Sequence, residues 1–312
     1  MTLARAVEVA RAARHRAYPK PTVGAVLVRD GEVVAEGATE PNGRHAERVV
    51  LDTAGERARG ATLYVTLEPC AHHGTTPPCT DAILAAGVER VVFGASDVNI
   101  EAAGGAKLLH GAGVDIEYVD APEARILEEA WRTWVSGRRP FVIYKAAVTL
   151  DGRVTVPGQR WVTGEASRRR VHELRAEVDA VAVGGGTARS DLPRLDARDV
   201  DTPRGQPRRL VFSRGPLPAG LDLELRTGPL AEELEVLAAE GVQSLLLEGG
   251  PTLAAAFFEA DLVDKVLVFV APKLAGAGRG LLAALPSART LSRLTATGVG
   301  DDVLLEAYVH EP

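Results

Sequence analysis

His45, Cys70 and Cys79 are separated along the chain, and they restrict its fold more than any other residues. One imidazole and two thiolates are a common set of zinc ligands, and a catalytic zinc site keeps a fourth position open for water. A fold that brings these side chains to one ion also brings Glu47 close to it, because Glu47 follows His45 by two residues. We therefore predict that His45, Cys70 and Cys79 bind Zn²⁺, while the carboxylate of Glu47 stays off the metal and moves protons.

The order of these four residues is typical of zinc-dependent hydrolytic deaminases. Two thiolates cancel the formal charge of Zn²⁺, so we expect Glu47 to help deprotonate a water molecule and to pass the proton to departing ammonia. Each residue alone has an ordinary explanation, since surface histidines are usually only solvated and cytosolic cysteines are often buried thiols. Together they favour a metal site, because Cys70 and Cys79 are the only cysteines in the chain.

Composition and charge argue against two classes of function. The 312 residues are enough for two domains, and the formal net charge of -6 disfavours binding to the phosphate backbone of a nucleic acid. The chain has no apolar run long enough to span a membrane, and its first twenty residues contain arginines but no apolar signal core. We predict a cytoplasmic protein that acts on a small molecule and binds neither nucleic acid nor membrane.

Alternating helix and strand patterns predict an α/β protein with two domains, residues 1–138 and 139–312. In the first domain we expect helices over residues 2–17, from the His-x-Glu motif to 54, and over 79–86, 106–111 and 122–136, with strands over 23–28, 32–36, 62–66, 90–93 and 114–118. Open α/β sheets place ligands at the carboxyl ends of strands, so zinc should lie there between two helix starts. Trp131 and Trp134 share one helical face, which indicates a packing role.

The second domain repeats this alternation after a break at residues 137–140. We expect strands over residues 141–148, 180–183, 209–212, 244–247, 265–270 and 302–309, and helices over 165–176, over 231–239 and from 251. Glycine-rich turns follow two of these strands, at residues 183–187 and 247–252, and either turn could hold a phosphate group. Neither matches a dinucleotide-binding fingerprint, so ordinary tight turns remain an equally good interpretation.

Longer motifs resemble the bifunctional deaminase/reductase family of bacterial riboflavin biosynthesis, and the likeness covers nearly the whole chain. In the first half it rests on Val65-Thr66-Leu67-Glu68-Pro69-Cys70 and on the segment from His72 to Cys79, which makes the cysteine spacing longer than in other nucleobase deaminases. In the second half it rests on Lys145 with Thr149-Leu150-Asp151-Gly152, on Trp161-Val162-Thr163, on His172-Glu173-Leu174-Arg175, and on Glu248-Gly249-Gly250-Pro251-Thr252-Leu253.

This resemblance implies a cytidine-deaminase-like α/β/α zinc domain followed by a dihydrofolate-reductase-like α/β domain. The first domain would remove an amino group from a phosphoribosylated diaminopyrimidinone by hydrolysis. The second would reduce the ribosyl group of that product to ribityl with NADPH. The resemblance also implies a homodimer formed through the carboxyl-terminal domain.

The resemblance also assigns roles to residues of the second domain. It implies NADPH contacts from Ala147, Trp161, Thr187, Asp191 and Ser213, and from Gly250, Pro251, Thr252, Leu253, Ala254, Ala255 and Ala256. It implies substrate contacts from Arg175, Leu195, Arg198 and Glu248, and the planar guanidinium groups among these suit a sugar phosphate. Because NADPH carries the hydride, the protein has only to orient the cofactor and the sugar and to supply a proton. Asp191 and Lys145 are our candidates for proton transfer.

Four features depart from the family pattern. Lys20 replaces an asparagine between two prolines, Asp97-Val98-Asn99 lacks an intervening proline, Leu192 replaces an acid, and residues 213–230 form a short stretch. Two alternative functions stay open at this point. One is a nucleic-acid deaminase with an accessory binding domain, and the other is an active deaminase with a non-catalytic carboxyl-terminal domain. Ammonia release from a free nucleotide and NADPH oxidation that depends on its product distinguish the three functions.

Overall fold

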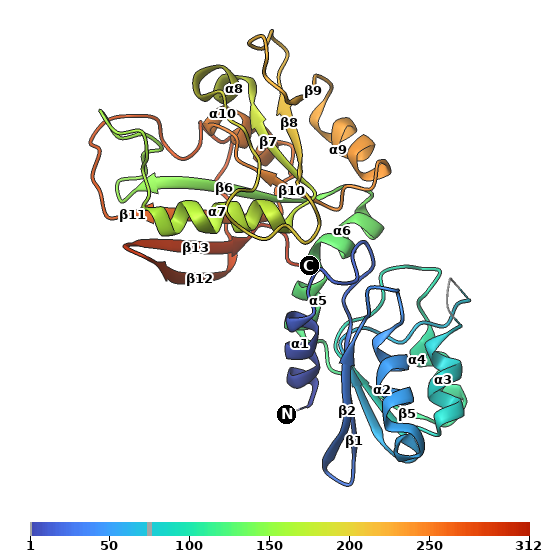
Figure 1. Cartoon of the computed structure of the whole chain (residues 1–312). Coiled ribbons are helices and arrows are strands. Elements are labelled where there is room, and N and C mark those ends of the chain that lie inside the picture. The colour runs from blue at the N-terminus through green and yellow to red at the C-terminus, as the bar shows by residue number, and fades with distance from the viewer. Residues whose placement is uncertain (1, 74–76) are drawn as a thin grey trace. The chain divides into compact units, whose positions relative to one another are not determined.

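The computed structural model describes residues 2–73 and 77–312, which form two compact units (Figure 1). The first unit ends at Gly137 and also includes Pro312, and the second unit spans Arg138–Glu311. Within the described residues, no helix is long and apolar enough to cross a membrane.

The first unit is built on a five-stranded sheet with the strand order β2-β1-β3-β4-β5. Its strands are β1 (Gly24–Arg29), β2 (Glu32–Ala38), β3 (Thr62–Val65), β4 (Arg90–Phe93) and β5 (Asp115–Tyr118). Asp30 and Gly31 both have positive φ, which suits the tight turn that pairs β1 with β2 in antiparallel fashion. β3, β4 and β5 are parallel, so helices must connect them.

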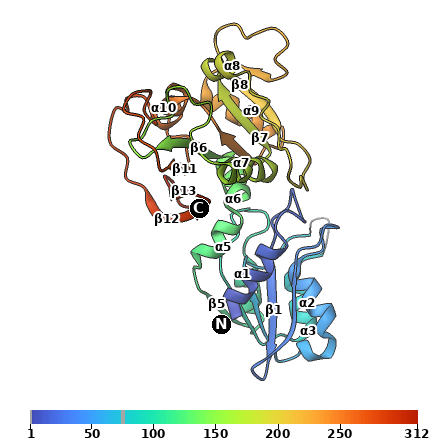
Figure 2. The same ribbon diagram turned by 60° about the vertical axis from the view of Figure 1, so that its left-hand side comes forward.

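Helices cover both faces of this sheet, and α1 lies opposite α2 and α3 in Figures 1 and 2. The helical elements are α1 (Thr2–Ala12), α2 (Ala46–Ala54), η1 (Gly55–Ala58), α3 (Cys79–Ala86), α4 (Gly105–Gly111), α5 (Pro122–Leu127) and α6 (Glu129–Gly137). Leu27 and Leu63 of the sheet, with Val50 of α2 and Ile83 of α3, are fully buried in the core. A Cβ on Gly24 would lie 2.1 Å from the Ala6 carbonyl oxygen, so glycine permits the close approach of α1 to β1.

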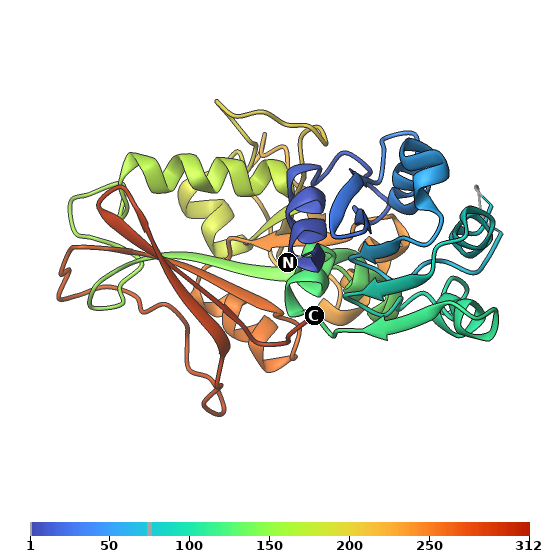
Figure 3. The ribbon, with the colours of Figure 1, turned by 90° about the horizontal axis from the view of Figure 1, so that it is seen from below.

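The second unit contains an eight-stranded mixed sheet with the order β12-β13-β11-β6-β10-β7-β8-β9. Its strands are β6 (Phe141–Thr149), β7 (Ala180–Gly184), β8 (Arg208–Phe212), β9 (Glu224–Arg226), β10 (Ser244–Leu247), β11 (Lys265–Ala271), β12 (Ser292–Val299) and β13 (Asp302–Tyr308). The strands from β11 to β9 are parallel to their neighbours, whereas β13 pairs antiparallel with β11 and β12. Figure 3 shows β12 and β13 as the red pair at one edge.

The helices of the second unit follow its parallel strands. They are α7 (Glu165–Glu177), α8 (Gly185–Asp191), α9 (Leu230–Ala239) and α10 (Pro251–Glu259). The sequence did not predict α8, β9 or β12. α8 starts inside a glycine-rich turn, β9 has only three residues, and most β12 residues are exposed, so none carries a strong hydrophobic period.

Two predicted helices of the first unit also differ from the structure. The first helix ends at Ala12 rather than at residue 17, and the helix predicted over 122–136 is interrupted at Glu128. The side chain of Glu128 turns inward and is 8% exposed, where it accepts a hydrogen bond of 2.8 Å from the backbone N–H of Thr22. Burial raises the pKa of Glu128 to about 8, although the Thr22 N–H and Arg14 lower it.

The substitution Glu128→Gln should therefore stabilise the protein by an amount that grows as pH rises above about 4.5 and is larger at pH 8 than at pH 5.5. Because the pKa of Glu128 is higher in the folded state than in the unfolded chain, the free energy of unfolding falls as pH rises from about 4.5 to about 8. Glutamine keeps the acceptor for Thr22 and has no proton to lose, so Tm at pH 8 should rise by roughly 4 °C. Calorimetry at pH 5.5 and pH 8 checks this, with the exposed Glu56→Gln as control. An equal shift at both pH values would contradict the prediction.

Candidate active sites

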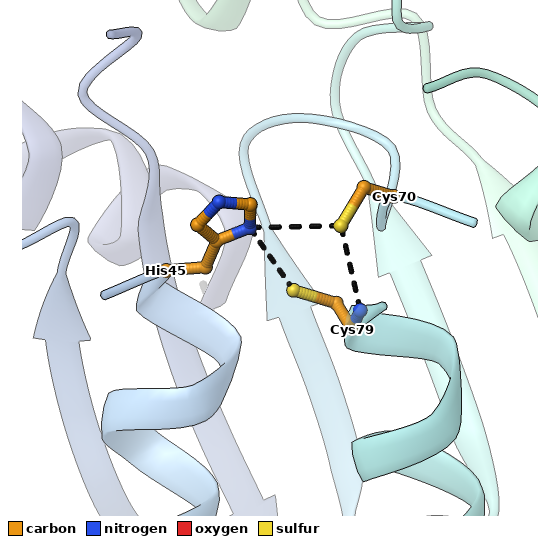
Figure 4. A group of neighbouring side chains, drawn as sticks. All are labelled: His45, Cys70 and Cys79. Atoms are coloured by element: carbon orange, nitrogen blue, oxygen red, sulfur yellow. Dashed lines mark hydrogen bonds between the residues drawn. The ribbon is translucent and has the colours of Figure 1, made fainter. Parts of the chain in front are cut away.

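Three element ends of the first unit bring the expected zinc ligands together (Figure 4). His45 immediately precedes α2, Cys79 is the first residue of α3, and Cys70 follows β3. Figure 4 shows the three side chains pointing toward one another. The Gly74–Thr76 part of the cysteine-spacing motif lies outside the described residues.

The distances between these side chains fit one tetrahedral zinc ion. His45 Nδ1 lies 3.2 Å from Cys79 Sγ and 3.6 Å from Cys70 Sγ, and the three ligand atoms all lie within 4.8 Å of one another. Zinc bonds of about 2.05 Å to nitrogen and about 2.3 Å to sulfur, at a tetrahedral angle, separate nitrogen and sulfur by about 3.5 Å. The donor set and its spacing therefore suit Zn²⁺.

Both cysteines are free and buried, with exposed fractions of 8% for Cys70 and 3% for Cys79. The pKa of the Cys70 thiol lies below its ordinary value because Cys79 and His45 donate hydrogen bonds to it. The backbone N–H of Cys79 adds a further hydrogen bond of 3.4 Å to Cys70 Sγ. These donors favour the thiolate form of Cys70, whereas the hydrogen bond to Cys70 raises the pKa of the Cys79 thiol, which needs the metal itself to lose its proton.

Glu47 lies in the first turn of α2 and is 3% exposed. Burial raises the pKa of its carboxyl group to about 7, although the positive charge of His45 lowers it. A carboxyl group with such a pKa can both accept and donate a proton near neutral pH. Glu47 lines the same cavity as His45 and Cys70, which is the position that an acid and base beside the metal requires.

The cavity beside this site has a volume of about 450 Å³. Trp131 and Trp134 of α6 form part of its wall, together with Lys20 and His72. The sequence predicted only packing for the two tryptophans. Trp131 does pack against the core, but both tryptophans also line the cavity. Helical spacing placed the two tryptophans on one face of the helix, but it could not show that this face borders a cavity.

Glu68 is a further cavity residue whose individual role the sequence did not indicate. Its carboxylate accepts hydrogen bonds from the backbone N–H groups of Asp97 at 3.3 Å, Gly104 at 3.2 Å and Ala106 at 3.1 Å. These bonds hold the loop that presents Asp97 and Asn99 to the cavity. The only signal in the sequence was the place of Glu68 in the motif that ends at Cys70.

In the second unit, a buried charge cluster forms around Glu248 at the end of β10. Arg175 donates hydrogen bonds of 2.6 Å and 3.0 Å to the two carboxylate oxygens, and Lys145 Nζ lies 3.5 Å from one of them. Burial raises the pKa of Glu248, but Lys145 and Arg175 outweigh that effect and lower it to about 2. The cluster therefore presents an ionised carboxylate between two cations.

The other expected substrate residues lie on a neighbouring segment. Arg198 forms an ion pair with Asp196, and its guanidinium lies 3.5 Å from Nε2 of His172. The carbonyl oxygen of Asp196 accepts a hydrogen bond of 3.1 Å from Arg175, which links this segment to the Glu248 cluster. The side chain of Leu195 is 2% exposed and packs in the core, so only its backbone can face a ligand.

The two glycine-rich turns face one cavity of about 460 Å³. Gly184 and Gly185 line it at the start of α8, and Thr252 and Leu253 line it at the start of α10. A Cβ on Gly185 would lie 2.3 Å from the hydroxyl oxygen of Ser213, so the turn has no room for a larger residue. Backbone N–H groups at helix starts suit the phosphates of a dinucleotide.

The expected cofactor residues have different surroundings. Ser213, Thr252, Leu253 and Ala256 line the glycine-rich cavity. The hydroxyl oxygen of Thr187 lies 3.1 Å from the point where a Cβ on Gly250 would be. Pro251 begins α10, Ala254 and Ala255 are buried, and Ala147 packs beside the core. Trp161 is 53% exposed beside two arginines. Asp191 is exposed at the end of α8, and within the described residues no hydrogen bond joins it to Lys145 or Glu248.

Comparisons with known proteins place each unit in a known family. A sequence profile of the cytidine and deoxycytidylate deaminase zinc-binding region matches residues 1–95, and one of the RibD C-terminal domain matches residues 140–305. The chain is 39% identical over 310 residues to riboflavin biosynthesis protein RibD of Aquifex aeolicus, covering 88% of this chain and 86% of that protein. It is 34% identical over 339 residues to the Escherichia coli RibD, covering 93% and 92%.

The chain belongs to the RibD family.

Solved RibD structures share the fold of the whole chain. RibD of Acinetobacter baumannii has a TM-score of 0.84 and 32% identity, with coverage of 98% of this chain and 97% of the other. A Thermotoga maritima deaminase/reductase has a TM-score of 0.83, 32% identity and the same 98% and 97% coverage. The predicted fold class, a cytidine-deaminase-like α/β domain followed by a reductase domain, is confirmed.

Membership of the RibD family confirms the predicted activity. The chain is a bifunctional deaminase and reductase of riboflavin biosynthesis, with a zinc-binding deaminase domain and an NADPH-dependent reductase domain. It acts on a small molecule. These findings favour the bifunctional enzyme over a nucleic-acid deaminase and over a deaminase with a non-catalytic second domain.

Removal of zinc should lower the thermal stability of the deaminase unit. Two buried thiolates and an imidazole lose their common partner when the ion leaves, so we expect Tm to fall by roughly 5 °C. Calorimetry of zinc-loaded protein with and without a chelator checks this. The Cys79→Ala variant should contain little zinc and should not respond to the chelator. Full zinc content in that variant would exclude Cys79 as a ligand.

Proposed function

We propose that residues 1–138 deaminate a phosphoribosylated diaminopyrimidinone and that residues 139–312 reduce the ribosyl group of the product to ribityl with NADPH. The observation that carries the first step is the cluster of His45, Cys70 and Cys79 beside the buried carboxyl group of Glu47, at a cavity of about 450 Å³. The identity of the substrate is supported by the Thermotoga maritima relative, whose name specifies a diaminohydroxyphosphoribosylaminopyrimidine deaminase.

In deamination, His45, Cys70 and Cys79 would hold zinc, which when bound would supply a water molecule with a lowered pKa. Glu47 takes a proton from the attacking water as the water oxygen bonds to the ring carbon that bears the amine. It then releases the proton to the amine nitrogen, which leaves as ammonia when the C–N bond breaks. Its burial at 3% exposure suits both halves of this transfer, because the proton is held near neutral pH. Trp131 and Trp134 offer flat apolar walls for the pyrimidine ring.

In reduction, the glycine-rich cavity receives the phosphates of NADPH, and NADPH supplies the hydride. We assign cofactor contacts to Ala147, Trp161, Thr187, Asp191, Ser213 and the turn from Gly250 through Pro251, Thr252, Leu253, Ala254 and Ala255 to Ala256. The buried side chains of Ala254 and Ala255 leave only their backbone for this role. Arg189 and Ser213 line the cavity beside Gly185, and their side chains support the placement of a phosphate there.

The substrate of reduction lies against the Glu248 cluster in this proposal. Glu248 accepts hydrogen bonds from sugar hydroxyls, Arg175 and Arg198 contact the phosphate, and Leu195 contributes its backbone. Lys145 is the better placed of our two proton-transfer candidates, because it lies 3.5 Å from the buried carboxylate of Glu248 whereas Asp191 is exposed. A buried ion pair holds the ammonium at one position, which suits proton delivery to a ring-opened sugar.

We further propose that the enzyme is cytoplasmic and forms a homodimer through residues 139–312. A reducing compartment keeps Cys70 and Cys79 available for the metal, which supports the location. The exposed edge strand β12, where the side chain of Leu294 is 68% exposed, supports the dimer, because unpaired edges and apolar residues favour association.

The diaminopyrimidinone nucleotide tests the proposed function directly. The zinc-loaded enzyme should release ammonia from it without NADPH, and NADPH oxidation should begin only after that release. Glu47→Gln should keep zinc but lower kcat for ammonia release on the order of 10³-fold, because glutamine cannot move the proton. Supplied with deaminated product, this variant should reduce it normally. Normal ammonia release by Glu47→Gln would remove Glu47 from the mechanism.

Gly185→Ala should weaken NADPH binding and leave deamination intact. The added methyl group overlaps the hydroxyl of Ser213, so the turn must open, and we expect the Kd for NADPH to rise by about tenfold. Fluorescence titration of NADPH measures this. Gly298→Ala on β12 is the matched control, because a Cβ there meets no atom within 4 Å. Equal NADPH affinity in both variants would place the cofactor elsewhere.

A further inference from the structure

The deaminase cavity has a buried floor and an exposed rim. Glu47 and Cys70 at its floor are 3% and 8% exposed, whereas Lys20 at its rim is exposed. A phosphate is costly to remove from water, so it stays near solvent while the reacting end of a nucleotide enters the floor. The rim is therefore the part of the cavity where the phosphate of the substrate lies.

The charges around the cavity make a cation at the rim necessary. Three carboxyl-bearing residues, Glu47, Glu68 and Asp97, line the cavity. Among the described residues that line it, Lys20 alone carries a permanent positive charge. Backbone N–H groups already donate hydrogen bonds to the carboxylates of Glu68 and Asp97, and no arginine is among the described lining residues, although the charge of Arg132 acts on Asp97 from outside the cavity. A doubly charged phosphate meets repulsion here unless Lys20 faces it.

Backbone hydrogen bonds at Lys20 and at Thr22 fix the position of Lys20 at this rim. Its own N–H donates to the carbonyl oxygen of Ala17 at 3.0 Å, and Thr22, two residues later, donates to the buried carboxyl group of Glu128 at 2.8 Å. Lys20 Nζ also lies only 2.8 Å from the point where a Cβ on Gly43 would be. The absence of a side chain at Gly43 therefore makes room for the ammonium group on the segment that leads to His45.

We propose that Lys20 binds the 5-phosphate of the nucleotide in the deaminase cavity and thereby selects the phosphorylated substrate over the corresponding nucleoside. This inference rests on the proposed deaminase function and adds a specificity residue to it. It also gives a role to a lysine that departs from the pattern of the family, in which this position is an asparagine. An alternative contact of Lys20 with a ring carbonyl affects nucleotide and nucleoside equally, so the two roles are separable.

Steady-state ammonia release tests this with two compounds, the phosphoribosylated diaminopyrimidinone and its dephosphorylated ribosyl counterpart. Lys20→Met keeps the aliphatic stem and removes the charge. We expect its KM for the nucleotide to rise by about tenfold, its kcat to stay within about twofold, and its KM for the nucleoside to be unchanged. Lys20→Arg should keep the preference for the nucleotide. Lys107→Met removes an equal charge from the exposed face of α4 and serves as the control.

An unchanged KM for the nucleotide in Lys20→Met overturns the inference, and so does an equal rise for both compounds. Ribose 5-phosphate gives a second measurement that needs no turnover. Calorimetry should resolve two sites in wild type, one of them the Arg175 and Arg198 site of the reductase unit, and Lys20→Met should weaken the other by the same factor of about ten. If wild type releases no ammonia from either compound, the proposed function fails, and the ribose 5-phosphate titration still decides whether Lys20 binds phosphate.

Discussion

The convergence of His45, Cys70 and Cys79 is the interaction on which the deaminase unit depends. Their ligand atoms come within 4.8 Å of one another because the loop after β3, the residue before α2 and the first residue of α3 meet at the carboxyl end of β3. At the ends of helices and strands, backbone N–H and C=O groups lack partners within the element, so polar side chains can gather there. The site is therefore a consequence of where regular structure stops, and the core beneath it fixes the spacing.

The Glu248 cluster of the reductase unit depends on the pairing of buried charges. A buried carboxylate is stable there because Arg175 and Lys145 surround it, and its pKa falls to about 2 as a result. Glu47 has the opposite environment, since burial raises its pKa to about 7. One carboxyl group is held as a permanent charge, and the other can exchange a proton near neutral pH. Neighbouring charges account for this difference in chemistry between identical side chains.

Hydrophobic periodicity predicted most helices and strands, and it failed where a segment lacks a buried face. β12 is an exposed edge, and α8 begins with glycines, so neither shows a clear period. Periodicity also missed the interruption at Glu128. The carboxyl group turns inward to accept a hydrogen bond from the N–H of Thr22, and a local pattern cannot predict a contact with so distant a residue. That one contact joins α5 and α6 to the segment that carries Lys20.

The sequence by itself determined the chemistry of the enzyme. Residue type and order at His45, Cys70 and Cys79 predict a zinc site, because one imidazole and two thiolates suit this metal and leave a fourth position for water, and they predict a proton carrier at Glu47. Tertiary structure alone decided what surrounds that chemistry. It placed Trp131 on the cavity wall, buried the side chain of Leu195, left Asp191 exposed and put Lys20 at the rim. Such surroundings depend on contacts between distant segments, and no local pattern of residues encodes them.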